Sequence, residues 1–234
     1  MEQHKQPDIT SLWPHQSHEL GFCYRHPEQQ IQFVTIPKCA SSWIKEIIRL
    51  LHWKPHNFVD KDTYDWTTLA VVRDPWDRWC SGVGEWLHRR FNTHHVHIQS
   101  FVDHMTQYNR KFEMHNTGHL REHEWHWIEK LIALGSPHDE HTEMQSAYLA
   151  NCTKIQAFNF GKTLSQDVHR HFKTQYKLSN DFHTIPPKLV RARHQIKDVV
   201  YRYLQDRKKV LLPYIKQVYK RDFDLYNNVM GTNK

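Results

Sequence analysis

The sequence predicts an α/β fold of three layers, in which a central, mostly parallel β-sheet is flanked by helices. Two short apolar runs, at residues 31–36 and 69–72, are rich in β-branched residues and show no clean alternation between polar and apolar positions. Unbroken runs of this kind are typical of central parallel strands that are covered on both faces. Signals for a turn and a helix follow each run at once, and this repeated order indicates parallel strands joined by helical crossovers.

Two helices are expected directly after these strands. The first begins at Ser41 or Ser42, because serine is a good N-cap, and it is apolar around most of its circumference. The second is better defined, since Asp74 is a natural N-cap and Pro75 falls at the first helical position, where proline is favoured. Helical spacing places Trp76, Trp79, Cys80, Val83, Trp86 and Leu87 on one face, and Asp74, Arg78, Ser81 and Glu85 on the opposite face.

The remaining chain is expected to belong to the same domain, because 234 residues fit a single α/β domain spanning 1–234. A polar, histidine-rich stretch at 1–27 is predicted to be an N-terminal arm that packs onto this domain. Residues 91–150 are aromatic, histidine-rich and helical in tendency, which indicates a helical insertion. A further strand and three further helices are predicted around 154–160, 164–172, 196–204 and 212–219.

The composition favours an anionic partner. Lys and Arg number 32 against 25 Asp and Glu, and the resulting net charge of +7 attracts nucleotides, nucleic acids and other polyanions. The four cysteines have no paired spacing, and the sequence contains no secretory signal or membrane-length apolar run. We therefore expect a reduced, cytoplasmic protein without a membrane segment. No histidine joins a Cys pair or a His-Glu-x-x-His pattern, so no metal is expected.

Both strand-to-helix junctions carry residues suited to binding an anion. The amino end of a helix offers unpaired backbone N–H groups and the positive end of the helix dipole. Lys38, Ser41 and Ser42 add a cation and two hydroxyl donors at the first junction, and Arg73 adds a guanidinium at the second. Two such junctions in one parallel sheet predict a single ligand that carries an anionic group at each end.

The residues of these junctions resemble the two nucleotide signatures of sulfotransferases that use 3′-phosphoadenosine 5′-phosphosulfate. The stretch 139–145 and the aromatic C-terminal helix are more loosely similar to parts of carbohydrate-type members. The resemblance implies a P-loop NTPase-like sulfotransferase fold. By this resemblance, Arg73 and Ser81 hold the 3′-phosphate, while the 5′-phosphosulfate lies in the turn formed by Pro37, Lys38, Cys39, Ala40, Ser41, Ser42 and Trp43. Many members have glycine where Ala40 stands, and its methyl group is expected to limit positive φ.

The reaction implied by this resemblance is in-line transfer of a sulfuryl group to a hydroxyl, or an amine, of a carbohydrate or small-molecule acceptor. The product is adenosine 3′,5′-bisphosphate, no metal is needed, and the insertion at 91–150 is expected to bind the acceptor. Lys38 would neutralise the bridging oxygen as the sulfuryl group leaves. A His or Glu acts as base in the family, and His56 is the first candidate here and His52 the second. Weaker candidates are Glu85 and His141 as base, and Lys188, Arg191 and Arg193 as a cluster over the 3′-phosphate.

Two other functions are compatible with the sequence. The charge of +7 and the nine tryptophans also fit a non-catalytic module that binds nucleic acid or another polyanion. A nucleotide kinase-like enzyme is less compatible, because the sequence lacks the Gly-x-x-x-x-Gly-Lys-Ser/Thr loop and Arg73 stands where such an enzyme would place a magnesium-binding carboxylate.

Overall fold

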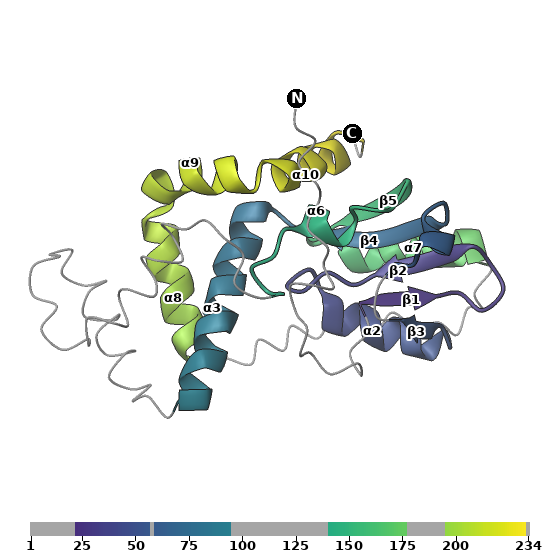
Figure 1. Cartoon of the computed structure of the whole chain (residues 1–234), viewed down its shortest axis with the longest axis horizontal. Helices are drawn as coiled ribbons and strands as arrows, with labels where there is room; N and C mark the ends of the chain where they lie inside the picture. The colour runs from purple at the N-terminus through teal and green to yellow at the C-terminus, as the bar shows by residue number, and fades with distance from the viewer. Residues whose placement is uncertain (1–21, 57–58, 95–139, 177–194, 233–234) are drawn as a thin grey trace, which may run out of the picture. The chain divides into compact units, whose positions relative to one another are not determined.

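The computed structural model describes residues 22–56, 59–94, 140–176 and 195–232 (Figure 1). The chain divides into two compact units. The first comprises 1–75, 144–189 and 221–234, and the second comprises 76–143 and 190–220. We describe each unit by itself, and the single domain expected over 1–234 stays a prediction.

The first unit is built on a mixed sheet of five strands in the order β3-β1-β2-β4-β5. Strands β2, β4 and β5 pair in parallel, whereas β1 is antiparallel to both β2 and β3. The structure therefore confirms the α/β class, with a sheet that is parallel at two pairings and antiparallel at two. The strands are β1 (Cys23–Arg25), β2 (Ile31–Val34), β3 (Lys54–His56), β4 (Thr67–Val72) and β5 (Lys154–Asn159).

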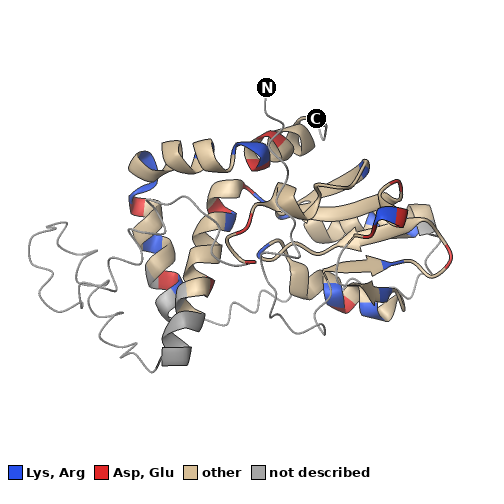
Figure 2. Cartoon of the chain, viewed as in Figure 1, with Lys and Arg blue, Asp and Glu red and all other residues tan. Residues whose placement is uncertain are grey.

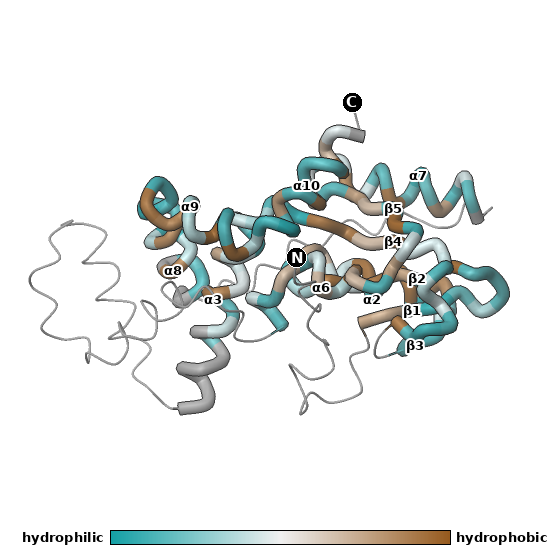
Figure 3. The backbone as a smooth tube through the Cα atoms, turned by 45° about the horizontal axis from the view of Figure 1, so that its top comes forward, coloured by the Kyte–Doolittle hydropathy of each residue, from teal (hydrophilic) through white to brown (hydrophobic). Residues whose placement is uncertain are grey.

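The register of the central strands brings the two junctions to the same edge of the sheet. Phe33 lies opposite Leu69, and Val34 lies opposite Ala70 in a parallel pair. Because parallel strands end at one edge, the turns that follow β2 and β4 leave the sheet as neighbours. Figure 3 shows the apolar run of β4 in brown, and residues 69–72 are all buried.

Strand β1 corrects part of the predicted N-terminal arm. Residues 1–21 lie outside the described residues, but Cys23–Arg25 occupies the sheet between β3 and β2. Cys23 pairs with Val34 on one side and with His56 on the other. A strand of three residues carries too little periodicity to be recognised, so only pairing with its neighbours defines it.

The described part of the first unit contains four α-helices. Helix α2 begins at Ser41, but its N-cap is Ala40, which corrects the serine cap predicted from the sequence. Helix α7 and strand β5 match the helix and strand expected around 164–172 and 154–160. One apolar cluster joins the sheet to α2 and α7 through Phe33, Ile44, Ile48, Leu69, Val71, Phe158, Leu164, Val168 and Phe172. The helices are α2 (Ser41–Leu50), α6 (Gln145–Tyr148), α7 (Leu164–Tyr176) and α10 (Lys220–Thr232).

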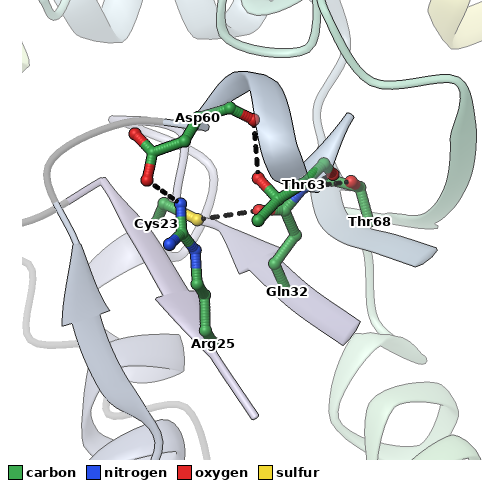
Figure 4. A network of polar contacts seen from close by, with 6 residues as sticks. All are labelled: Cys23, Arg25, Gln32, Asp60, Thr63 and Thr68. Atoms are coloured by element: carbon green, nitrogen blue, oxygen red, sulfur yellow. Dashed lines mark hydrogen bonds and ion pairs between the residues drawn. The ribbon is translucent and has the colours of Figure 1, made fainter. Parts of the chain in front are cut away.

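A buried polar network stabilises the sheet near the amino ends of β2 and β4 (Figure 4). The Gln32 side chain is fully buried. Its Oε1 accepts from the Cys23 thiol at 3.3 Å, and its Nε2 donates to the Thr63 carbonyl and the Thr68 hydroxyl, each at 3.0 Å. Satisfied hydrogen bonds offset the desolvation of the amide, so Gln32 is tolerated within an otherwise apolar strand.

The second unit contains α3 (Pro75–His94), α8 (Gln195–Asp206) and α9 (Lys208–Val218). The predicted tryptophan face of α3 is buried at Trp76 and Trp79, whose ring centroids are 5.6 Å apart. An ion pair joins α8 to α3: the Lys197 ammonium lies 2.6 Å from the Glu85 carboxylate. The predicted tail helices are confirmed, and α9 begins four residues before the expected start at 212.

The opposite face of α3, predicted to be polar, is covered by residues 140–143. Arg78 is buried and donates to the Glu143 carbonyl. A methyl group at Gly82 would lie 2.1 Å from the His141 carbonyl oxygen, so this close approach requires glycine. Residues 140–143 of the predicted insertion at 91–150 thus pack within the second unit, whereas residues 144–150 belong to the first unit. Residues 95–139 of that insertion lie outside the described residues.

Candidate functional site

The turn between β2 and α2 has two residues in the left-handed region. The Cys39 N–H donates to the Ile36 carbonyl at 3.1 Å, which closes a four-residue turn with Pro37 second and Lys38 third. Lys38 has φ 68°, and this combination fits a type II turn, in which the third position needs positive φ. The turn therefore ends β2 abruptly and presents Lys38 at the edge of the sheet.

Ala40 corrects one expectation from the sequence. Its φ of 58° and ψ of 22° are left-handed, so the methyl group does not prevent the conformation that glycine adopts easily. For an L-residue this conformation costs about 1–2 kcal/mol. The turn keeps its shape because Ala40 is the N-cap of α2 and its carbonyl accepts the Ile44 N–H at 3.0 Å.

The amino end of α2 is suited to an anion. Alanine has no side-chain oxygen, and within the described residues no side chain caps this helix. Ser41 is half-buried and Ser42 is exposed, so the hydroxyls stand beside the orphan N–H groups of the first turn. Cys39 and Trp43 are buried in the core, and their role in the turn stays a prediction.

Arg73 joins the second junction to the first. It follows the last residue of β4, and its Nη1 donates to the Lys38 carbonyl at 3.3 Å. Its guanidinium lies over the Phe160 ring, with Cζ 4.8 Å from the ring centroid. Since arginine carries five N–H donors, a guanidinium held by one of them can still bind an anion with others. Lys38 and Arg73 therefore lie side by side at one edge of the sheet.

Gln145 is a residue of this site that the sequence did not single out. It is fully buried at the start of α6, and its Oε1 accepts from the Arg73 N–H at 2.8 Å and from the Cys39 thiol at 3.2 Å. Its Nε2 donates to the Arg73 carbonyl at 2.9 Å. One side chain thus contacts both junctions. The only signal in the sequence was its place in the stretch 139–145.

His56 lies at the same edge of the sheet as the junctions. It is the last residue of β3 and pairs with Cys23, which pairs with Val34 at the end of β2. Two strand spacings, about 10 Å, therefore separate His56 from Val34. Burial lowers the pKa of His56 below its usual value, and the positive charge of Arg25 lowers this pKa further. The ring is neutral at pH 7 and able to accept a proton.

His52 lies at the other end of α2. The helix places it about 15 Å from Ser42. Its N–H donates to the Arg49 carbonyl at 3.1 Å, the Trp53 N–H donates to the Ile48 carbonyl at 3.3 Å, and its φ is 57°. These features define a Schellman motif, with His52 as the left-handed residue that ends the helix. The structure does not bring His52 to Lys38, and its conformation has a structural explanation.

The other predicted site residues belong to the second unit or lie outside the described residues. Ser81 is half-buried in α3, and Glu85 forms the ion pair with Lys197. His141 is buried, with Nδ1 3.3 Å from the Glu140 carboxylate. The roles expected for these three side chains stay predictions. Lys188, Arg191 and Arg193 lie outside the described residues.

Over the four described ranges, no three His, Cys, Asp or Glu side chains are arranged to hold a metal ion. No helix in those ranges is both long enough and apolar enough to cross a membrane. Figure 2 shows basic residues on α8, α9 and α10 as well as beside the sheet.

Comparisons with protein-family models, with curated proteins and with solved structures give no match to this chain. Its function is therefore inferred from the residues and geometry of the two junctions.

Proposed function

We propose that the protein is a sulfotransferase that moves a sulfuryl group from 3′-phosphoadenosine 5′-phosphosulfate to a hydroxyl, or an amine, of a carbohydrate or small-molecule acceptor. One observation carries the proposal: the two junctions that resemble the family's nucleotide signatures meet at one edge of the sheet, with Arg73 Nη1 3.3 Å from the Lys38 carbonyl. The parallel pairs β2–β4 and β4–β5 support the accompanying proposal of a P-loop NTPase-like sulfotransferase fold.

The chemistry of the first junction suits the 5′ end of this nucleotide. Lys38 supplies a positive charge, and the amino end of α2 supplies backbone donors and the hydroxyls of Ser41 and Ser42. Arg73, held beside the Lys38 carbonyl, supplies planar guanidinium donors for the 3′-phosphate. The contribution of Ser81 that the resemblance implies stays a prediction.

In the proposed reaction, a bond from sulfur to the acceptor oxygen forms while the bond from sulfur to the bridging phosphate oxygen breaks. Lys38 and the α2 dipole stabilise the negative charge that grows on the bridging oxygen. His56 is the base that we propose for the acceptor proton, because it lies at the correct edge of the sheet and its lowered pKa keeps the ring neutral. The position of His52 at the far end of α2 argues against an equal role for that residue.

A thermal-shift comparison of adenosine 3′,5′-bisphosphate with AMP and ATP tests this proposal. A ligand that binds only the native state raises the melting temperature. We expect the bisphosphate to stabilise the wild type strongly and AMP weakly, because AMP lacks the 3′-phosphate that Arg73 would bind. Arg73→Ala should remove this preference, whereas Arg202→Ala, an exposed arginine of α8, should keep it.

Three results would contradict the proposal. Equal stabilisation by AMP and the bisphosphate would show that the 3′-phosphate is not recognised. Stabilisation by ATP alone would favour a kinase-like enzyme. Tight binding of single-stranded DNA with a steep dependence on salt, without an effect of the bisphosphate, would favour a polyanion-binding module.

A further inference from the structure

We propose that Gln145 is a positioning residue that holds the two anion-binding junctions in one fixed arrangement, and that Asp222 of α10 holds Gln145 in turn. We call Gln145 and Asp222, with their hydrogen bonds to Cys39, Arg73 and Ser146, the clamp. The identity of the bound ligand rests on the proposed function, whereas the clamp rests on hydrogen bonds within the first unit. The Gln145 side chain connects segments that are far apart in the sequence, since it lies 106 residues from Cys39 and 72 residues from Arg73.

The Gln145 side-chain amide forms with the Arg73 backbone the two hydrogen bonds that a neighbouring strand would form. The last ladder pair between β4 and β5 is Val72 with Asn159, so Arg73 follows the end of the ladder. There the Gln145 side chain accepts the Arg73 N–H at 2.8 Å and donates to the Arg73 carbonyl at 2.9 Å. A carboxamide matches both groups of one residue, and this pair fixes which end of the amide is nitrogen.

This pairing constrains the Arg73 side chain as well as its backbone. A backbone fixed at both its N–H and its carbonyl has little freedom in φ and ψ, so the direction of the side chain is set. That direction leads to the Lys38 carbonyl and the Phe160 ring. The bond from the Cys39 thiol to the same Gln145 oxygen, at 3.2 Å, adds a contact to the residue between Lys38 and Ala40.

Asp222 anchors the clamp. Its carboxylate accepts the N–H groups of Gln145 and Ser146, both at 2.8 Å, and the Ser146 hydroxyl at 2.7 Å. The Asp222 side chain is buried, with 1% of its surface exposed, so these charge-assisted bonds lie away from solvent. The C-terminal helix is thereby connected to the backbone from which Gln145 extends.

The replacement Gln145→Glu tests the clamp with almost no change in shape. A carboxylate still accepts from Arg73 N–H and Cys39, but its second oxygen faces the Arg73 carbonyl and repels it. A protonated carboxyl group has an O–H donor and restores the bond. Burial beside a carbonyl raises the pKa of such a carboxyl group, so the defect should grow with rising pH and disappear with falling pH.

Gln32→Glu is the matched control. Gln32 is equally buried, also accepts from a cysteine thiol and also donates to a backbone carbonyl, but it lies near the amino ends of β2 and β4 (Figure 4). Gln32→Glu should lower the melting temperature as Gln145→Glu does, but it changes no contact of either junction. Any loss of binding that is due only to lower stability will therefore appear in both variants.

Two measurements on the full chain decide the matter. Calorimetry with adenosine 3′,5′-bisphosphate should show at least about tenfold weaker binding by Gln145→Glu than by the wild type near pH 9, because a buried carbonyl is left without its donor. Near pH 5.5 the two proteins should agree within about threefold, since the protonated carboxyl group restores that donor. Gln32→Glu should match the wild type at both pH values. Hydrogen exchange near pH 9 should be faster in Gln145→Glu at the backbone amides of residues 36, 38–42, 73 and 74, and unchanged there in Gln32→Glu.

The outcomes separate the clamp from the proposed function. Wild-type affinity of Gln145→Glu at every pH, or an equal loss in Gln32→Glu, would overturn the clamp. If the wild type itself does not bind the bisphosphate, the proposed function fails, and hydrogen exchange still decides: unchanged protection at either junction in Gln145→Glu overturns the clamp, and faster exchange at both supports it.

Discussion

Replacing His52 by glycine should stabilise the protein without affecting the reaction. His52 is an exposed residue with φ 57°, where it ends α2 in a Schellman motif. The left-handed conformation costs an L-residue about 1–2 kcal/mol. Glycine avoids that cost but loses about 0.5–1 kcal/mol more backbone entropy on folding. The difference predicts a net gain of about 0.5–1 kcal/mol in the free energy of unfolding.

Scanning calorimetry of three variants measures this effect. His52→Gly should raise the melting temperature by about 1–4 °C, given the usual shift per kcal/mol for chains of this length. His52→Ala keeps the left-handed strain, so its melting temperature should stay close to that of the wild type. Leu50→Gly, at an exposed helical position of the same helix, should lower stability by about 1 kcal/mol.

The same variants test the catalytic role of His52. Since the residue lies about 15 Å along α2 from Ser42, neither His52→Gly nor His52→Ala should change the rate of the proposed sulfuryl transfer. A destabilised His52→Gly protein would refute the assignment of strain. A large fall in the single-turnover rate of both variants would refute the assignment of His52 to a structural role.

The remaining predictions concern the site and the packing of α3. Lys38→Ala should abolish transfer, measured by turnover, while the melting temperature stays within a few degrees of the wild type; full turnover would contradict its role. Arg73→Ala should raise the dissociation constant for adenosine 3′,5′-bisphosphate in calorimetry, and an unchanged constant would exclude the proposed contact. His56→Ala should slow the single-turnover rate by roughly a hundredfold; in the wild type that rate should level off at high pH and fall as the pH drops through a pKa below the usual value of histidine, because the neutral ring is the base and burial and the charge of Arg25 lower its pKa. Gly82→Ala should destabilise the fold by about 1–3 kcal/mol, since its methyl group would meet the His141 carbonyl, and a neutral effect in thermal unfolding would contradict that close approach.

Prediction from the sequence succeeded where strong local signals coincide. The apolar runs of β2 and β4 and the Asp74-Pro75 pair before α3 each act within a few residues. They sufficed to place the two junctions and the α/β class. The same signals did not reveal that Lys38 and Ala40 are left-handed, because neither is glycine.

Pairing between distant segments accounts for what could not be predicted. Strands β1 and β3 have three residues each and no periodic pattern, so their place in the sheet depends on partners elsewhere in the chain. The burial of Arg78 depends on the carbonyl of Glu143, and the environment of His56 depends on Arg25. None of these partners is adjacent in sequence.

The sequence by itself determined the two junctions, their order and the residue types that suit an anion at each, because helix caps, turns and apolar runs act over short distances. Only the tertiary structure decided that Arg73 meets the Lys38 carbonyl, that His52 ends a helix far from that contact, and that Gln145 binds both junctions. The physical reason is that strands and helices end with unsatisfied backbone groups. For the Lys38 carbonyl and the Arg73 backbone, the missing partner is a side chain distant in sequence, which arrives only once the chain has folded.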